Sequence, residues 1–568
     1  MSDSSLPLRA LFAAGLMAGA LAGGVVRAAE PQTSVGASTP AQVSAAPKPE
    51  EIAYTVTPEL DGGRLRDLAV SISFKADPSG RTWVHLPASW SGAHELWRAI
   101  DGVSAKDARA ERPEPARLVL TSRPNAPVSL TYRIRQDFQG EMSTAVGSPF
   151  RPITRPTWFT AVGWASFAQI EGRTADPVSF RWGPTPPGWT LASNLDRPAR
   201  AERRIDALMD SVLTGGEGMS VVEQPADGGR VRVAMHGQWK VSAAQLAQLQ
   251  GRIAAASGAF WNEHGDDLFV VLTPLQAPPG QTAQFGVNLG EAFALWATHE
   301  VDGPSLRHIL AHEHQHVWLP NRIGGVRTGA DEPLDYWLSE GFTDFYTLRI
   351  LLRSGVYSLE DFVADYNRIL AAYAASPVKE APNAMVRARF WSDRAIADLP
   401  YQRGLLLAAR WDDRLRRLSG GKADLDEVVL AMKAMTTADA GAETAPLAQA
   451  NLKTAFFQLG GGDLSGDYAR FVEGGRRVLL PEDLFGDCAK VRTSTAPSDL
   501  SPGERLAAET NAARPGALVY RTASASVAGP MRDLAAGRPT LLLQQIELTP
   551  NMSPQTRARC TALMAGER

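Results

Sequence analysis

A short stretch near the middle of the chain could bind a metal ion and use it for hydrolysis. It reads His312-Glu313-His314-Gln315-His316, an HExxH pattern, in a chain with nine histidines among 568 residues. Residues four apart share one face of a helix, so His312 and His316 can direct imidazole nitrogens at the same ion. Glu313 lies one step round the helix, where a carboxylate can act as a general base. Because so few histidines make a chance match rare, the spacing predicts a zinc site.

Two histidines leave such a site incomplete, since a catalytic zinc usually has three protein ligands and a water in its fourth position. The best candidate for the third ligand is Glu340. Asp344 lies four residues later, on the same face of a predicted helix, and can accept a hydrogen bond from a ligating histidine and so fix its tautomer. We therefore expect one Zn²⁺ per chain, held by His312, His316 and Glu340.

Two helices must position these side chains. The first is predicted to begin at Pro304-Ser305, because proline is favourable in a first turn and serine caps helices, and to end before Pro320. The second is predicted to include residues 336–346. On the first helix His314 should point away from the metal and have a structural role. His308, one turn before His312, is either close to the cleft or an ordinary packed position.

Composition and the N-terminus bear on location and partners. The chain is 44% hydrophobic with a net charge of −3, which predicts two to four domains and indicates no nucleic-acid partner. Residues 1–28 are predicted to be a signal peptide cut near Ala28, and residues 29–51 a disordered linker, so we expect a periplasmic or secreted protein. The alternative is a membrane anchor formed by an uncleaved N-terminal segment. No later segment is apolar enough to span a membrane, so no stable insertion is expected after signal removal.

The remaining sequence predicts an α+β multidomain protein. Residues 52–191 show short β-rich runs separated by turn residues, which predict an N-terminal β domain. Residues 192–486 are predicted to form the catalytic domain, with a sheet lobe at 192–300 and a mainly helical lobe at 301–486. The weak pattern in residues 487–568 predicts a loop-rich C-terminal tail. Cys488 and Cys560 either form a disulfide in an exported protein or remain two free thiols.

These motifs resemble those of the glycyl aminopeptidase family of zinc metallopeptidases, within the thermolysin-like group that uses glutamate as third ligand. The resemblance implies a thermolysin-like zincin catalytic domain behind an N-terminal β domain, and a peptide or protein substrate. It also implies an aminopeptidase that favours N-terminal Gly or Ala, with Tyr401 helping to hold the oxyanion. The matching segments are HEHQHVW at 312–318, LSEGFTDFY at 338–346, YQRG at 401–404 and SGG at 419–421.

The chain departs from that family in two places. Family members often carry a C-terminal PDZ domain, which is not recognisable in the tail. They also carry a Gly-Leu-Glu-His-like segment on the strand at the cleft edge, where this chain has Leu289-Gly290-Glu291-Ala292. Glu291 and Gly290 are nevertheless candidates for binding substrate, Glu291 through the free α-amino group. Two alternatives stay open: a zinc endopeptidase with the same site, and a catalytically silent metallopeptidase-like binding protein.

Overall fold

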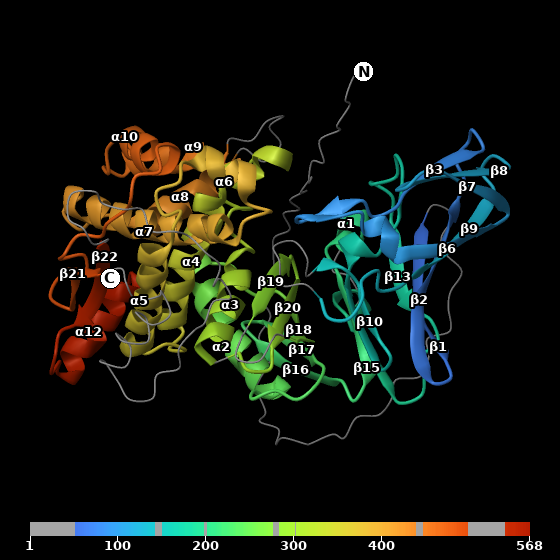
Figure 1. Cartoon of the computed structure of the whole chain (residues 1–568), viewed down its shortest axis with the longest axis horizontal. Helices are drawn as coiled ribbons and strands as arrows, with labels where there is room; N and C mark the ends of the chain where they lie inside the picture. Colours follow the sequence, from blue (N-terminus) through green and yellow to red (C-terminus); the bar gives the residue numbers. More distant parts are fainter. Residues whose placement is uncertain are drawn as a thin grey trace, which may run out of the picture.

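Strands fill the N-terminal part of the chain and helices the C-terminal part (Figure 1). A computed structural model describes residues 51–142, 150–197, 202–276, 283–301, 303–438, 447–497 and 540–567. The predicted signal peptide and nearly all of the predicted linker lie outside the described residues. The order of a β region followed by a mainly helical catalytic region confirms the α+β fold class.

Two sheets of the N-terminal region pack face to face. In β1 buried residues alternate with partly buried ones, so one face of the strand is directed into the core. Buried residues of both sheets share one hydrophobic cluster. The first sheet has the order β13-β1-β2-β9-β6, with β1 at Ile52–Asp61, β2 at Arg64–Lys75, β6 at Ile100–Lys106, β9 at Pro127–Ile134 and β13 at Val178–Trp182. The second has the order β12-β3-β8-β7, with β3 at Arg81–His85, β7 at Ala108–Glu114, β8 at Arg117–Ser122 and β12 at Gln169–Ile170.

A third sheet crosses the boundary that the sequence predicted at residue 191. In it β15 pairs with both β11 and β14, although β15 follows that boundary. Backbone pairing between distant segments fixes this arrangement, and residue composition does not reveal it. The order is β10-β11-β15-β14, with β10 at Ile153–Arg155, β11 at Trp158–Val162, β14 at Trp189–Ser193 and β15 at Val212–Glu217.

The catalytic region begins with a five-stranded mixed sheet that has β16 at one edge and β19 at the other. One face of this sheet packs against α2 (Ala243–Trp261) and α3 (Gly303–Gln315), whereas the other packs against residues of the N-terminal region. Each central strand is therefore apolar on both faces. The order is β16-β17-β18-β20-β19, with β16 at Ser220–Ala226, β17 at Gly229–Met235, β18 at Leu268–Leu275, β19 at Gln284–Leu289 and β20 at Ala292–Thr298.

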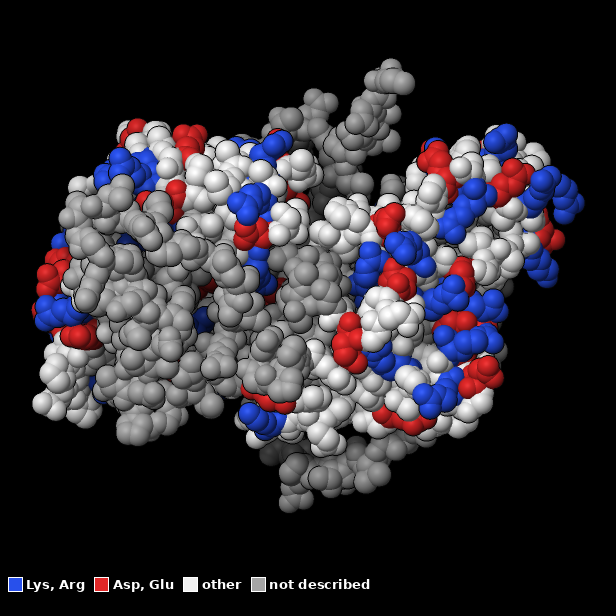
Figure 2. Space-filling model, viewed as in Figure 1, with Lys and Arg blue, Asp and Glu red and all other residues white. Residues whose placement is uncertain are grey.

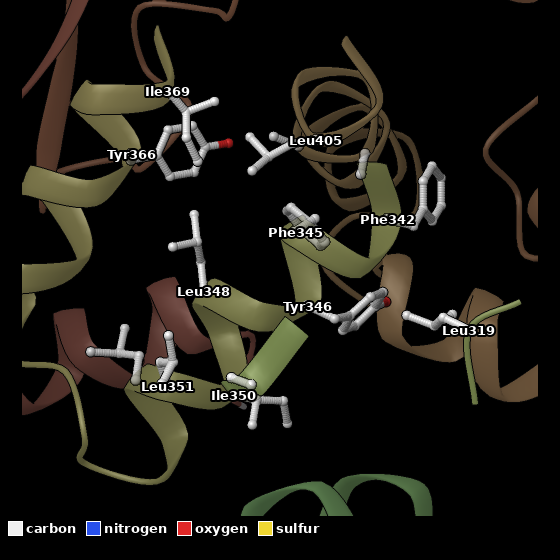
Figure 3. Close-up of a cluster of buried hydrophobic side chains, with 14 of the residues drawn as sticks. Leu319, Phe342, Phe345, Tyr346, Leu348, Ile350, Leu351, Tyr366, Ile369 and Leu405 are labelled. Atoms are coloured by element: carbon white, nitrogen blue, oxygen red, sulfur yellow. The ribbon is translucent and has the colours of Figure 1, made fainter. Parts of the chain in front are cut away.

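The helical part is built around α4, which is buried along most of its length. Its apolar side chains interlock with those of α5 and α7 (Figure 3). In Figure 3 Leu348 of α4 points toward Tyr366 and Ile369 of α5. This packing holds α4, and the glutamate it carries, in a fixed orientation. The helices are α4 at Tyr336–Arg353, α5 at Leu359–Ala375, α6 at Asn383–Arg389, α7 at Arg394–Leu418, α8 at Leu425–Ala438 and α9 at Ala448–Gln458.

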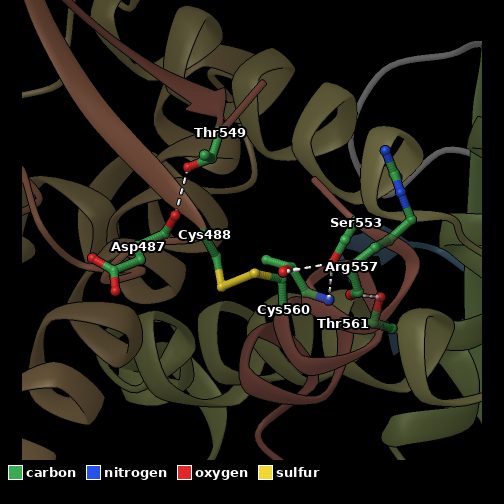
Figure 4. Close-up of a disulfide and its surroundings, with 8 residues drawn as sticks. Asp487, Cys488, Thr549, Ser553, Arg557, Cys560 and Thr561 are labelled. Atoms are coloured by element: carbon green, nitrogen blue, oxygen red, sulfur yellow. Dashed lines mark hydrogen bonds between the residues drawn. A yellow bond between two sulfur atoms is a disulfide. The ribbon is translucent and has the colours of Figure 1, made fainter. Parts of the chain in front are cut away.

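The described parts of the C-terminal segment are ordered elements, in contrast to the predicted loop-rich tail. Strands β21 (Ala489–Pro497) and β22 (Thr540–Leu548) pair antiparallel, and α12 (Pro554–Ala565) packs on α4. The Cys488–Cys560 disulfide joins α12 to the segment that enters β21 (Figure 4). Pairing between strands far apart in sequence, together with this cross-link, orders a segment whose local pattern is weak.

Charged side chains of both signs share the face of the N-terminal region that Figure 2 shows, where Lys and Arg are interspersed with Asp and Glu. Among the residues that the structure describes, no helix combines the length and apolar character needed to cross a membrane.

Candidate zinc site

Helix α3 carries the HExxH motif against the sheet. It runs from Gly303 to Gln315, so it ends several residues before Pro320, where the sequence predicted the stop. His316 lies in the turn that follows the helix. The ring of His316 is fixed by a hydrogen bond from Nδ1 to the carbonyl oxygen of Leu319, at 2.8 Å. A backbone contact thus orients the second histidine although it lies just beyond the helix.

Three ligand atoms converge between α3 and α4. His312 Nε2 lies 3.0 Å from His316 Nε2, and each of these atoms is 3.3 Å from Glu340 Oε2. For comparison, donors about 2.1 Å from one tetrahedral zinc ion are separated by roughly 3.4 Å. The structure therefore brings the three predicted ligands together at the spacing of a shared metal ion.

The hydrogen bonds of the two rings show that this spacing suits a cation. The carbonyl of Leu319 can only accept, so Nδ1 of His316 carries its proton. Asp344 Oδ1 accepts from Nδ1 of His312 at 2.7 Å. When both rings are neutral, each Nε2 atom therefore carries a lone pair that faces the other Nε2 and the carboxylate of Glu340. Such an arrangement is unfavourable without a positive charge between the atoms, and two histidines with a glutamate are a usual donor set for zinc.

Asp344 connects His312 to further polar residues. Its Oδ1 also accepts from His308 Nε2, at 3.1 Å, and His308 Nδ1 lies 2.7 Å from Asp365 Oδ2. Burial acts to raise the pKa of Asp344, but hydrogen bonds from His308 and His312 outweigh it, so the pKa lies well below its usual range. An ionised Asp344 keeps Nε2 of His312 free for a metal. Of the two alternatives for His308, the structure places it beside the site.

The carboxylate of Glu340 is ionised for a similar reason. Burial acts to raise its pKa, but the attraction of His316 and hydrogen bonds from His312 and His316 lower it far below the usual value. Helix α4 presents Glu340 and Asp344 one turn apart, as predicted, so that one carboxylate faces the convergence point and the other braces a ring.

Glu313 lies between α3 and the edge strand β19. Its side chain is buried, and burial raises its pKa despite the attraction of His312 and His316. Gly286 of β19 packs directly against it, and Asn288 Nδ2 donates to the backbone carbonyl of Glu313 at 2.8 Å. The predicted general base is thus adjacent to the free edge of the sheet.

The side chain of Tyr401, on α7, lies beside His312 at the candidate zinc site. Its ring stacks on that of His312, with centroids 5.8 Å apart. Helices α4 and α7 approach closely because glycines meet: a Cβ at Gly341 would lie 2.3 Å from the Cα of Gly404. Burial, followed by the nearby charges of Glu340 and other carboxylates, raises the pKa of Tyr401 well above its usual value, so its hydroxyl remains a hydrogen-bond donor.

The two residues predicted to bind substrate lie in the turn between β19 and β20. Gly290 and Glu291 form the turn of the hairpin, and Glu291 is exposed there and attracts Arg203 electrostatically. Gly286, further back along β19, is the strand residue that meets Glu313. Which residue of β19 meets Glu313 depends on how the strand packs against α3, and the role of Gly290 and Glu291 in substrate binding stays a prediction.

Other side chains at the site gave little or no signal in the sequence. His314 is buried against Phe293 and Trp318, consistent with a structural role, and burial lowers its pKa to about 3. Asp365 and Gly286 were not singled out, although the spacing of His308 four residues before His312 offered one clue.

Comparisons with known proteins identify a family model and solved structures that are similar to this chain. Residues 305–388, which contain all three candidate ligands, match the model of the M61 glycyl aminopeptidase family. An aminopeptidase N family protein from Idiomarina loihiensis has a similar fold, with a TM-score of 0.63 and 17% identity over 79% of this chain and 80% of that one. An M1 zinc metallopeptidase from Deinococcus radiodurans aligns with a TM-score of 0.47 and 16% identity, over 76% and 95% of the two chains. No curated protein matches the chain significantly. The family resemblance inferred from the motifs is confirmed for residues 305–388.

Proposed function

We propose that this chain, a zinc metallopeptidase whose residues 305–388 form an M61 glycyl aminopeptidase domain, is an exported aminopeptidase that removes small N-terminal residues such as Gly and Ala from peptides. The observation that carries this function is the convergence of His312 Nε2, His316 Nε2 and Glu340 Oε2 next to Glu313. The preference for small residues follows the family match, and export follows the leader-like residues 1–28.

His312, His316 and Glu340 would hold one zinc ion per chain. When bound there, zinc supplies Lewis acidity, which makes water more acidic and polarises a peptide carbonyl. Asp344 keeps His312 in the tautomer that leaves Nε2 unprotonated, and the carbonyl of Leu319 does the same for His316.

Glu313 is the general base. It accepts a proton from the attacking water and later passes that proton to the departing amine. Its burial excludes bulk water from the proton transfer, and the contact with Gly286 limits its rotamers. Tyr401, held over His312, donates a hydrogen bond from its hydroxyl to the oxyanion that develops on the substrate carbonyl.

Strand β19 supplies the backbone for substrate binding. It is the edge strand of its sheet, and its outer side carries backbone groups that can pair with an extended peptide. Because Gly286 lies on this strand against Glu313, a peptide paired with β19 is delivered to the general base.

The test is a substrate panel with metal analysis. Zinc content should be one ion per chain, and Gly- or Ala-aminoacyl amides should be cleaved in a chelator-sensitive way. Preferred cleavage of N-acetylated peptides would favour the endopeptidase alternative, and binding of peptides without any cleavage would favour the silent binding protein. Sequencing of the mature N-terminus from a periplasmic fraction tests export and cleavage near Ala28.

A further inference from the structure

The turn that follows α3 carries the candidate zinc ligand His316 and also the group that orients its ring. The carbonyl oxygen of Leu319 accepts a hydrogen bond from Nδ1 of His316 at 2.8 Å. The backbone N–H of Leu319 donates to the carbonyl oxygen of Gln315 at 2.9 Å. Because His316 lies beyond the last residue of the helix, the direction of its ring depends on how this turn is held.

Trp318 attaches the turn to the C-terminal end of α2. Its buried indole lies flat against that of Trp261, with ring centroids 5.6 Å apart and 9° between the planes. Its Nε1 donates to Oε2 of Glu263, just beyond the end of α2, at 2.8 Å. An indole that is both stacked and hydrogen-bonded has little freedom to move. The backbone next to the Leu319 carbonyl is therefore held against α2.

The carboxylate of Glu263 interacts with three donors. Besides Trp318, it pairs with Arg322, which follows the turn, and with Lys433 of α8. Lys433 Nζ also donates to the backbone carbonyl of Trp261, at 2.7 Å. Burial acts to raise the pKa of Glu263, but hydrogen bonds from Lys433 and Trp318 outweigh it, so the pKa lies below its usual value. One ionised carboxylate thus joins α2, α8 and the turn.

Gln315 provides a second attachment to α2. Its side chain is fully buried, and its Oε1 accepts from Nε1 of Trp261 at 3.1 Å. Its Nε2 donates to Oγ of Ser257 at 2.8 Å. The residue before His316 and the residue two after it are therefore both fixed to α2, although the three candidate ligands come from α3, the turn after it and α4.

We propose that Trp318 and Glu263 are positioning residues for zinc binding. The hydrogen bond between their side chains holds the turn so that the Leu319 carbonyl keeps the ring of His316 directed at the metal. The inference rests on the proposed function in one respect, that His316 is a zinc ligand. It gives a role to the last residue of the HEHQHVW segment and to a carboxylate beyond α2 that no motif in the sequence pointed to.

Two substitutions remove this hydrogen bond from opposite ends. Trp318→Phe keeps an aromatic ring against Trp261 but lacks the N–H group, and Glu263→Ala removes the acceptor. Trp164→Phe is the matched control in the N-terminal region, because Trp164 also stacks on a tryptophan and donates its Nε1 to a carboxylate, that of Asp210, at 2.9 Å. Zinc affinity of each metal-free protein is measured by competition with a chelator, and its free energy of unfolding is measured in denaturant.

We expect Trp318→Phe and Glu263→Ala each to lower zinc affinity about 10- to 100-fold, the loss typical of residues that orient metal ligands. Trp164→Phe should keep the wild-type affinity. The double variant of Trp318 and Glu263 should lose no more than the more affected single variant, because both changes remove the same bond. A purely structural role would instead lower the free energy of unfolding and leave the zinc affinity of the folded protein unchanged.

Unchanged zinc affinity in either folded variant would overturn the proposal. A double variant in which the two losses multiply would also overturn it, because Trp318 and Glu263 would then act separately. If one single variant does not fold, the other decides by comparison with the control. If the wild type binds no zinc, the zinc site itself fails and this inference with it, whereas a wild type that binds one zinc per chain isolates the test to the two residues.

Discussion

Gly286 on β19 lies so close to Glu313 on α3 that a Cβ at position 286 would be 2.2 Å from Oε1 of the glutamate. The edge strand and the general base therefore share a contact that leaves no room for a side chain. Any residue larger than glycine must displace either β19, the proposed substrate-binding strand, or the carboxylate of Glu313, the proposed general base.

We accordingly expect Gly286→Ala to lower kcat/KM by about 100-fold, the loss typical of a 1 Å misplacement of a catalytic group. Gly303→Ala is the control, because a Cβ there meets nothing within 4 Å at the start of the same helix. Steady-state kinetics of the two proteins, with zinc content measured in parallel, check this. Equal activity of Gly286→Ala and the control would show that the contact does not constrain Glu313.

Replacing the general base should separate chemistry from metal binding. Glu313→Gln keeps the shape of the side chain but cannot accept a proton, so we expect kcat to fall by about 100- to 10,000-fold with zinc content unchanged. Glu340→Gln, by contrast, should lose zinc as well, because Glu340 provides one of the three converging ligand atoms. Metal analysis of both variants beside their kinetics distinguishes the roles. Full activity of Glu313→Gln would contradict the mechanism.

Tyr401→Phe removes one hydroxyl and keeps the ring that stacks on His312. If Tyr401 stabilises the oxyanion, kcat should fall by about 100-fold or more while KM changes little, because the donor acts mainly in the transition state. Tyr336→Phe is the comparison: its hydroxyl bonds the carboxylate of Glu332, so we expect kcat to fall less than in Tyr401→Phe. A loss confined to KM in Tyr401→Phe would assign the residue to substrate binding.

His308 should act on zinc affinity through Asp344. Its Nε2 and His312 Nδ1 both bond Asp344 Oδ1, so His308→Ala leaves Asp344 less firmly oriented. We expect zinc affinity to fall by about 10- to 100-fold, measured by competition with a chelator on the metal-free protein. His264→Ala, which removes an exposed histidine paired with Asp227, is the control. Unchanged zinc affinity in His308→Ala would limit that residue to packing.

The disulfide should stabilise the C-terminal segment. Cys488 and Cys560 are 72 residues apart, and closing a loop of that length contributes about 4 kcal/mol to the free energy of unfolding in the chain-entropy view. The double variant Cys488→Ser, Cys560→Ser should lose a stability of that order in denaturant unfolding. Because α12 packs on α4, the loss should extend to the helix that carries Glu340. An unchanged unfolding midpoint would show that the cross-link is dispensable.

How far the sequence predicted the site depended on distance along the chain. His312, His316, Glu340 and Asp344 were found because each pair is four residues apart, and a helix converts that spacing into a shared face. That the two pairs would meet was predicted from the need of a catalytic zinc for a third protein ligand, since spacing within one helix does not place a second helix beside it.

The sequence by itself thus determined the candidate metal ligands, the β-then-helical order of the fold and the two helices of the site, because these follow from local periodicity and short motifs. Only the tertiary structure decided that Gly286 and not Glu291 meets Glu313, that Asp365 and His308 extend the contacts of Asp344, and that the C-terminal segment pairs as strands. Each of these depends on packing or backbone pairing between residues far apart in sequence, and no local pattern encodes such contacts.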